Sequence, residues 1–103
     1  MEKNIILNMS FKQYNYKDPI KHEGCCFCCD CYLAGLNGNI EEAFDYAVQN
    51  GWVRGSDSYV LNHNGLINGL KKKYGTSGRS GTRVNTGNHF VVKVGGNIVY
   101  NPA

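Results

Sequence analysis

Long apolar runs are missing from this sequence, and so are dense clusters of one charge. No stretch approaches the roughly 20 apolar residues that span a bilayer, and Ile5–Leu7 is too short for a signal-peptide core. Lysine and arginine number 11 against 8 acidic residues, with the densest basic run at Lys71–Lys73. Nucleic-acid-binding modules usually have denser basic clusters. We therefore expect a cytoplasmic protein with neither a membrane nor a nucleic-acid partner.

The short basic run allows two interpretations. We interpret Lys71–Lys73, with Arg79 and Arg83 beyond it, as a solvated helix end followed by loop charges. A patch that binds an anionic ligand is the alternative. Neither interpretation indicates a cofactor.

Cysteine is absent outside Cys25–Cys31, a segment that holds all five cysteines of the chain. A disulfide framework spreads its cysteines so that each bridge closes a loop, and this cluster closes none. Reduced thiols in a cytoplasm are the simpler interpretation. Structural zinc sites usually take ligands from two separated pairs, but the second half offers only His63 and His89. We expect no bound metal.

Helical spacing of apolar residues dominates the middle of the chain. It predicts helices over 25–36, from Ile40 to the Asn-Gly pair at 50–51, and from 62–64 to the Tyr-Gly pair at 74–75. We expect Asn39 to cap the second helix and Asn62 or Asn64 the third. Residues 1–24 are interpreted as an extended lead-in with at most one short strand, Ile5–Leu7. Residues 75–88 are rich in Gly, Ser and Thr, which predicts a loop or an edge turn.

The clearest strand pattern comes last. His89–Val94 is β-branched and aromatic, Gly95–Asn97 predicts a tight turn, and Ile98–Tyr100 predicts a returning strand. Alternation places Phe90, Val92 and Val94 toward the core. Helices followed by a hairpin predict a single α+β domain over 1–103, with N-terminal helices packed on a small C-terminal antiparallel sheet.

Cys25 follows Gly24 at the predicted start of a helix. The unpaired N–H groups and the dipole of a helix N-terminus favour a thiolate, so we expect a lowered pKa for this thiol. The backbone N–H of Cys25 can also bind an oxyanion, and Gly24 would let a substrate carbonyl approach the backbone. Cys28, Cys29 and Cys31 are interpreted as packing or surface residues, because cysteine is a small hydrophobe.

His89 opens the strongest strand, and Asn101 lies just past the strand that returns beside it. We expect the two to be neighbours across the hairpin, roughly opposite each other. The side-chain carbonyl of Asn101 would then accept the imidazole N–H and fix its tautomer, which is the arrangement of a Cys–His–Asn acyl-transfer site. The side-chain amide of Gln13 would supply a second oxyanion donor. His22 and His63 have no comparable partner in the sequence and are interpreted as surface residues.

Four short segments together resemble a known pattern: 12–14 (Lys-Gln-Tyr), 23–25 (Glu-Gly-Cys), 88–92 (Asn-His-Phe-Val-Val) and 100–102 (Tyr-Asn-Pro). They resemble papain-like cysteine peptidases of the bacteriocin-leader-processing type and their small phage- and plasmid-encoded relatives. The resemblance implies a papain-like fold, a peptide or protein substrate, Cys25 as nucleophile, His89 as base, Asn101 as orienting residue and Gln13 as oxyanion donor.

The predicted reaction is hydrolysis or transfer at an amide, thioester or isopeptide carbonyl, through an acyl-thioester at Cys25. Two alternatives come from other classes. The first is a catalytically inactive binding protein that kept the papain-like fold, since the third member in that group is more often Asp than Asn. The second is a metal or redox module built on the Cys25–Cys31 cluster.

Overall fold

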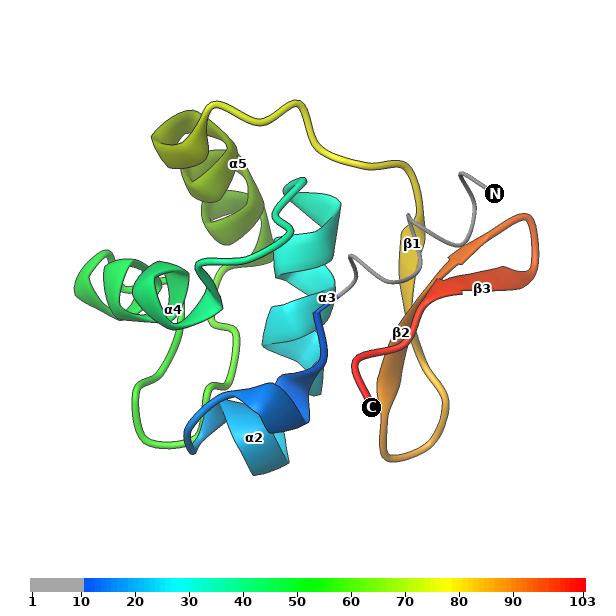
Figure 1. Ribbon diagram of the computed structural model, residues 1–103, viewed down its shortest axis with the longest axis horizontal. Helices are drawn as coiled ribbons and strands as arrows, with labels where there is room; N and C mark the ends of the chain where they lie inside the picture. The colour runs from blue at the N-terminus through cyan, green and yellow to red at the C-terminus, as the bar shows by residue number, and fades with distance from the viewer. Residues whose placement is uncertain (1–10) are drawn as a thin grey trace.

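The structure of the chain is a computed structural model, and it describes residues 11–103. Helix α3 (Cys25–Leu33) lies between a three-stranded sheet on one side and helices α4 (Ile40–Gln49) and α5 (His63–Tyr74) on the other (Figure 1). The predicted helices and the α+β class are therefore confirmed. The predicted strand Ile5–Leu7 lies outside the described residues.

The helix ends follow the sequence signals at one cap and depart from them at another. The Asn62 side chain accepts the backbone N–H of Gly65 at 2.9 Å, so the predicted cap of α5 is confirmed. Gly75, with φ 66°, ends α5 in the left-handed conformation. Asn39 also has a positive φ, 58°, and makes no side-chain capping bond. The predicted cap at Asn39 is therefore wrong, because the left-handed backbone there replaces the extended one that a capping residue adopts.

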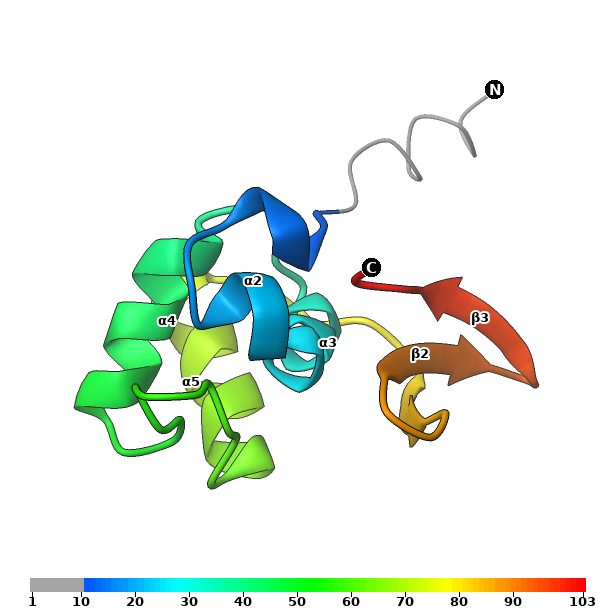
Figure 2. The same cartoon turned by 90° about the horizontal axis from the view of Figure 1, so that it is seen from below.

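The lead-in is not extended as predicted. It forms a 3-10 turn, η1 (Gln13–Asn15), and a short helix, α2 (Ile20–Glu23), which lies beside the N-terminal end of α3 (Figure 2). The backbone N–H of Gln13 donates to the carbonyl of Pro102 at 2.8 Å, which ties the lead-in to the C-terminal segment. Ile20 is 2% exposed, so burial of its side chain holds α2 in place.

The sheet is antiparallel in the order β1 (Thr82–Asn85), β2 (Phe90–Val94), β3 (Asn97–Tyr100). The hairpin of β2 and β3 is confirmed, and it turns at Gly95 and Gly96, both with positive φ, as a two-residue hairpin turn of this kind requires. The loop prediction for 75–88 is wrong at β1. That strand has one strongly apolar residue in four, and it is defined by pairing with β2 rather than by its own sequence.

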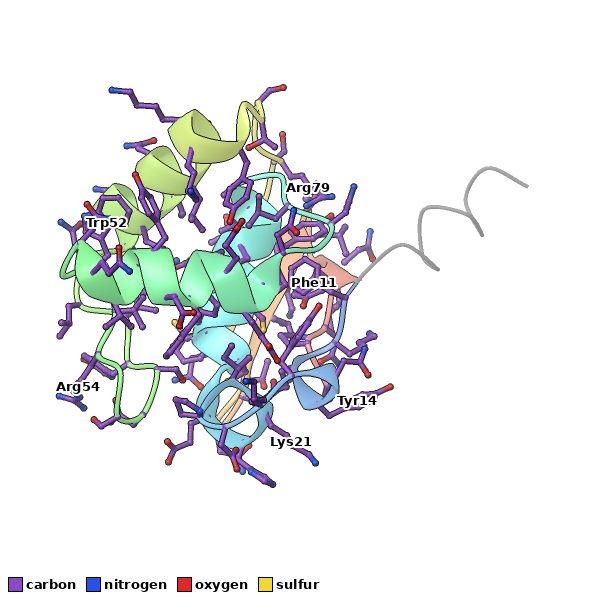
Figure 3. The ribbon with its side chains drawn as sticks, turned by 60° about the vertical axis from the view of Figure 1, so that its left-hand side comes forward. Phe11, Tyr14, Lys21, Trp52, Arg54 and Arg79 are labelled. Atoms are coloured by element: carbon purple, nitrogen blue, oxygen red, sulfur yellow. The ribbon has the colours of Figure 1, made fainter. Side chains whose placement is uncertain are left out.

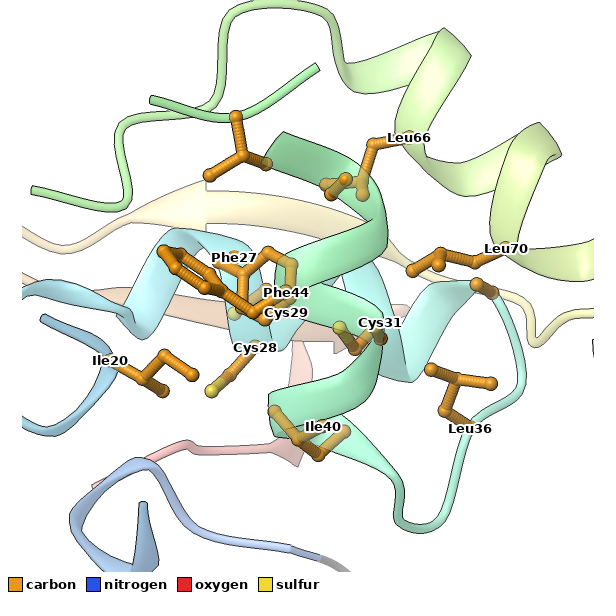
Figure 4. Close-up of a cluster of buried hydrophobic side chains, with 14 of the residues drawn as sticks. Ile20, Phe27, Cys28, Cys29, Cys31, Leu36, Ile40, Phe44, Leu66 and Leu70 are labelled. Atoms are coloured by element: carbon orange, nitrogen blue, oxygen red, sulfur yellow. The ribbon is translucent and has the colours of Figure 1, made fainter. Parts of the chain in front are cut away.

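The core lies around α3 (Figure 4). Val92 faces it as predicted, but Val94 is 44% exposed because it adjoins the hairpin turn, and Val91 is 2% exposed. The predicted inward set Phe90, Val92 and Val94 is therefore wrong at Val94. Within residues 11–103, no helix combines the length and apolar character that a membrane span needs. The largest fully buried core side chains include Phe27, Cys28, Cys29, Cys31, Ile40, Leu66 and Leu70.

The two arginines beyond α5 are bonded inside the protein: Arg79 lies in the loop, as predicted, whereas Arg83 lies in β1. The guanidinium of Arg79 donates to the backbone carbonyls of Tyr32 and Leu36 at 2.8 Å each and lies over the Tyr32 ring (Figure 3). Arg83 donates to the Asp30 carboxylate at 2.6 Å. Both guanidinium groups thus have internal acceptors, which argues against the alternative of an anion-binding patch.

Candidate functional site

Helix α3 runs in the same direction as β2, and this places the predicted site residues at one end of the molecule. Cys25, at the start of α3, and Phe90, at the start of β2, line one cavity. At the other end, Leu33 and Val92 both lie near Gly81. The start of β2 and the segment that follows β3 therefore lie toward the N-terminal end of α3 (Figure 1).

The predicted contact between His89 and Asn101 is confirmed. The Nε2 atom of His89 lies 2.9 Å from Oδ1 of Asn101, and the backbone N–H of Ala103 donates to the same Oδ1 at 3.0 Å. An N–H must face an acceptor, so this atom of Asn101 is the amide oxygen. It follows that Nε2 of His89 carries the proton and that Nδ1 of the neutral ring has the free lone pair.

A bulge in the hairpin changes how this pair meets. Val92 pairs with Tyr100, whereas Lys93 pairs with Ile98, so β3 holds one extra residue. Continued from Val92–Tyr100, this register puts His89 opposite residue 103. The His89 and Asn101 side chains therefore meet diagonally and not directly opposite each other as expected.

Cys25 is the first residue of α3 and is half-buried. No side chain caps this helix, and the N–H of Cys28 bonds back to the Gly24 carbonyl at 2.8 Å. The N–H groups of the three preceding residues, 25–27, have no intrahelical acceptor, which suits an oxyanion. Among residues 11–103, no hydrogen bond joins the Cys25 thiol to His89. The two groups are brought to one end of the sheet without being bonded to each other.

Gly24 has a packing role that differs from the predicted one. A Cβ atom at this position would lie 2.6 Å from the carbonyl oxygen of Ile20 and 2.7 Å from its Cα. The glycine is thus required for the close contact between α2 and α3. Ile20 occupies the space on the Cβ side of Gly24, and the approach of a substrate carbonyl to this backbone stays a prediction.

Gln13 lies close to the C-terminal segment but not in the cavity beside Cys25. Its side chain is 9% exposed, and its amide nitrogen donates to the Lys21 carbonyl at 3.1 Å. Its amide oxygen is buried and has no hydrogen-bond partner within residues 11–103. The ammonium group of the neighbouring Lys12 donates to the backbone carbonyl of Asn101 at 2.7 Å. One amide hydrogen of Gln13 is therefore already used by Lys21.

A cavity of about 340 Å³ opens between the start of α3, the start of α5 and the loop 54–60. Cys25, Cys26 and His63 line it. The loop is fixed by Ser58, whose hydroxyl donates to the Glu23 carbonyl at 2.8 Å and whose φ is 60°. A left-handed residue other than glycine persists only where its surroundings hold it, and the bond to Glu23 holds Ser58 in this wall of the cavity.

His63 has a buried acidic partner that the sequence analysis missed. Its Nδ1 atom lies 2.5 Å from Oδ2 of Asp30, and Arg83 donates to Oδ1 of the same carboxylate at 2.6 Å. Asp30 is fully buried, and burial raises the pKa of its carboxyl group while His63 and Arg83 oppose that rise. The prediction that His63 is an unpartnered surface residue is wrong. His22 is exposed as predicted but pairs with Asp18 at 2.6 Å.

Cys26 completes a cluster with Asp30 and His63. One sulfur, one carboxylate oxygen and one ring nitrogen of these residues lie within 4.8 Å of one another. Burial, together with the negative charge of Asp30, raises the pKa of the Cys26 thiol to about 12. Cys26 is therefore a protonated thiol at neutral pH, which favours Cys25 as the nucleophile of the pair.

The other three cysteines pack in the core, so their interpretation as packing residues is confirmed. Cys28, Cys29 and Cys31 are each 0% exposed. Burial raises the pKa of the Cys28 thiol to about 12 and that of Cys31 well above its ordinary value. These positions have neither the access nor the thiolate that a metal or redox module needs.

One signal in the sequence points to the missed cluster. Asp30 is the only charged residue of α3, a helix whose other residues are cysteines, aromatics and a leucine. An acidic side chain in such a helix needs a partner if it is buried. Only the fold identifies His63 and Arg83 as its partners.

No protein-family model matches the chain, and neither does any curated protein or solved structure.

Proposed function

We propose that this protein is a papain-like cysteine hydrolase in which Cys25 is the nucleophile, His89 the base and Asn101 the residue that orients the base. The observation that carries the proposal is the bond from Nε2 of His89 to the Asn101 amide oxygen, which leaves the other ring nitrogen as a proton acceptor. This pair lies at the end of the sheet where α3 presents Cys25.

The proposed reaction requires the Cys25 thiol and Nδ1 of His89 to come within hydrogen-bond distance. As Nδ1 of His89 takes the thiol proton, the sulfur of Cys25 attacks a carbonyl carbon. The oxyanion is bound by N–H groups in the first turn of α3, with the second hydrogen of the Gln13 amide as a further donor. The protonated ring then gives its proton to the leaving group, and water releases the acyl group from sulfur.

The substrate class follows from the chemistry of an acyl-thioester. An amide, thioester or isopeptide carbonyl of a peptide or protein would suit it, with part of the substrate in the cavity next to Cys25. A catalytically inactive binding protein with the same fold is the rival, favoured by the missing bond between Cys25 and His89. The experiment must therefore detect a covalent intermediate and not binding alone.

Acetylation by p-nitrophenyl acetate, with a chelator present, tests this proposal. We expect mass spectrometry to find the acetyl group on Cys25, with release of p-nitrophenol. His89→Ala should slow acetylation about 100-fold, which is a typical contribution of a general base. The exposed His22 is the matched control, and His22→Ala should leave the rate unchanged.

The outcomes separate the alternatives. Acetylation spread over Cys25 and Cys26 at similar rates, with no effect of His89→Ala, would leave the inactive binding protein as the better description. Label found only on Cys26 would move the nucleophile by one residue and contradict the proposed role of Cys25.

A further inference from the structure

Cys26, Asp30 and His63 form a cluster that the proposed reaction does not use. Their donor atoms lie within 4.8 Å of one another, although they come from two helices that are far apart in the sequence. A thiol, an imidazole and a carboxylate are the three ligand types that bind zinc in proteins. We propose that this cluster binds a divalent transition-metal ion of the zinc type.

The buried side of the cluster is built to hold its ligands in place. Asp30 is fully buried, and Arg83 holds Oδ1 of its carboxylate at 2.6 Å. A ligating carboxylate is commonly fixed in this way by a hydrogen bond to its second oxygen. Arg83 also favours the charged form of Asp30, against the burial that raises the pKa of this carboxyl group.

The metal would take the place of hydrogens at the ligand atoms. The ion binds the Nδ1 lone pair of a neutral His63 ring that carries its hydrogen on Nε2, and the thiol hydrogen of Cys26 is released as the thiolate binds. Because Nδ1 and Oδ2 are only 2.5 Å apart, they must separate slightly to accept an ion between them. His63 can move because its side chain is 35% exposed.

The open side of the cluster faces the cavity. Cys26 and His63 line that cavity together with Cys25 and Glu23. Three protein ligands with a free position toward solvent are the usual arrangement of an accessible zinc site, in which water is the fourth ligand. The expectation of no metal rested on two separated ligand pairs, with only His63 and His89 available for the second, whereas this site needs one cysteine and two residues brought to it by the fold.

Cobalt titration of the full chain, reduced and free of chelator, tests the proposal. We expect the visible bands of four-coordinate Co²⁺ and a thiolate-to-cobalt charge-transfer band, saturating at one equivalent and lost when Zn²⁺ is added. Cys26→Ser should abolish the charge-transfer band. Cys25→Ser is the matched control, because it removes a thiol from the same cavity and should keep the band.

A second variant distinguishes the loss of a metal ligand from the loss of the fold. His63→Ala removes a buried ion-pair partner, so its circular dichroism is compared with that of the parent, and its apparent affinity for Co²⁺ should fall at least about tenfold. No charge-transfer band at a large excess of Co²⁺, or a band that survives Cys26→Ser, would overturn the proposal. Neither result depends on hydrolysis, so this proposal and the proposed function can fail separately.

Discussion

The pairs His89–Asn101 and His63–Asp30 differ in burial and charge. His89 is half-buried and Asn101 is exposed, and Nε2 of His89 lies 2.9 Å from Oδ1 of Asn101. Asp30 is fully buried and has two cationic or potentially cationic partners at 2.5 and 2.6 Å. The first pair joins the two ends of one hairpin, whereas the second joins α3 to α5 and to β1.

This difference separates two uses of a histidine. A single hydrogen bond between a half-buried ring and an exposed amide contributes little to folding, so its value lies in fixing the tautomer of a base. A buried charged group must keep its partners, because an unpaired buried charge costs several kcal/mol. We therefore expect substitutions at Asp30 to act on stability and those at Asn101 to act on reactivity.

The largest effect should come from Asp30→Ala. It removes the shared acceptor of His63 and Arg83, and loss of one member of a buried ion pair costs about 3 kcal/mol. The urea midpoint should fall accordingly, with an unchanged slope. Asn101→Ala is the matched control, and we expect a change within about 0.5 kcal/mol, as for most surface positions. Equal losses at both positions would remove the contrast between the pairs.

Gly24→Ala should come next, with a loss of about 2 kcal/mol from overpacking. The new methyl group would meet the backbone of Ile20, which cannot move without displacing α2 from α3. Gly38→Ala serves as control, because a Cβ there meets nothing within 4 Å. We expect it to be neutral or slightly stabilising in the same urea titration. A neutral Gly24→Ala would show that α2 can shift freely.

Asn101→Ala should slow acetylation of Cys25 about tenfold, which corresponds to the loss of one hydrogen bond of ordinary strength. Without the amide oxygen, the His89 ring no longer favours the tautomer that accepts the thiol proton. Asn97→Ala, in the same hairpin, controls for disturbance of β3 and should keep the parental rate. If Asn101→Ala and the parent react equally fast, Asn101 is not an orienting residue.

The two pairs also differ in how far the sequence could predict them. His89 and Asn101 are 12 residues apart and joined by one tight hairpin, so the strand pattern and the turn were enough to bring them together. Asp30 is 33 residues from His63 and 53 from Arg83. No local pattern connects these three, because their contact depends on how α5 and β1 pack against α3.

The same rule explains the smaller errors. Helices α4 and α5 follow from the spacing of their own apolar residues. Strand β1 could not be predicted in this way, because its conformation comes from pairing with β2. The orientation of Gln13 also depends on tertiary contacts, since both Lys21 and Pro102 hold it. Local patterns thus predict elements, and long-range packing decides which side chains share a cavity.

The smallest predicted effect concerns the start of α5, which positions His63. Asn62→Ala removes the side-chain bond to the Gly65 N–H and should lower stability by about 1 kcal/mol. Asn39 precedes α4 in the corresponding place but makes no such bond and has a φ of 58°. Asn39→Gly should therefore leave stability unchanged or raise it slightly, since glycine adopts this conformation freely.

Because the cap also fixes the first turn of α5, Asn62→Ala should weaken Co²⁺ binding at His63, whereas Asn39→Gly should not. Urea titration and cobalt titration of both variants check this pair, and a loss of stability in Asn39→Gly equal to that in Asn62→Ala would contradict the assignment of the caps.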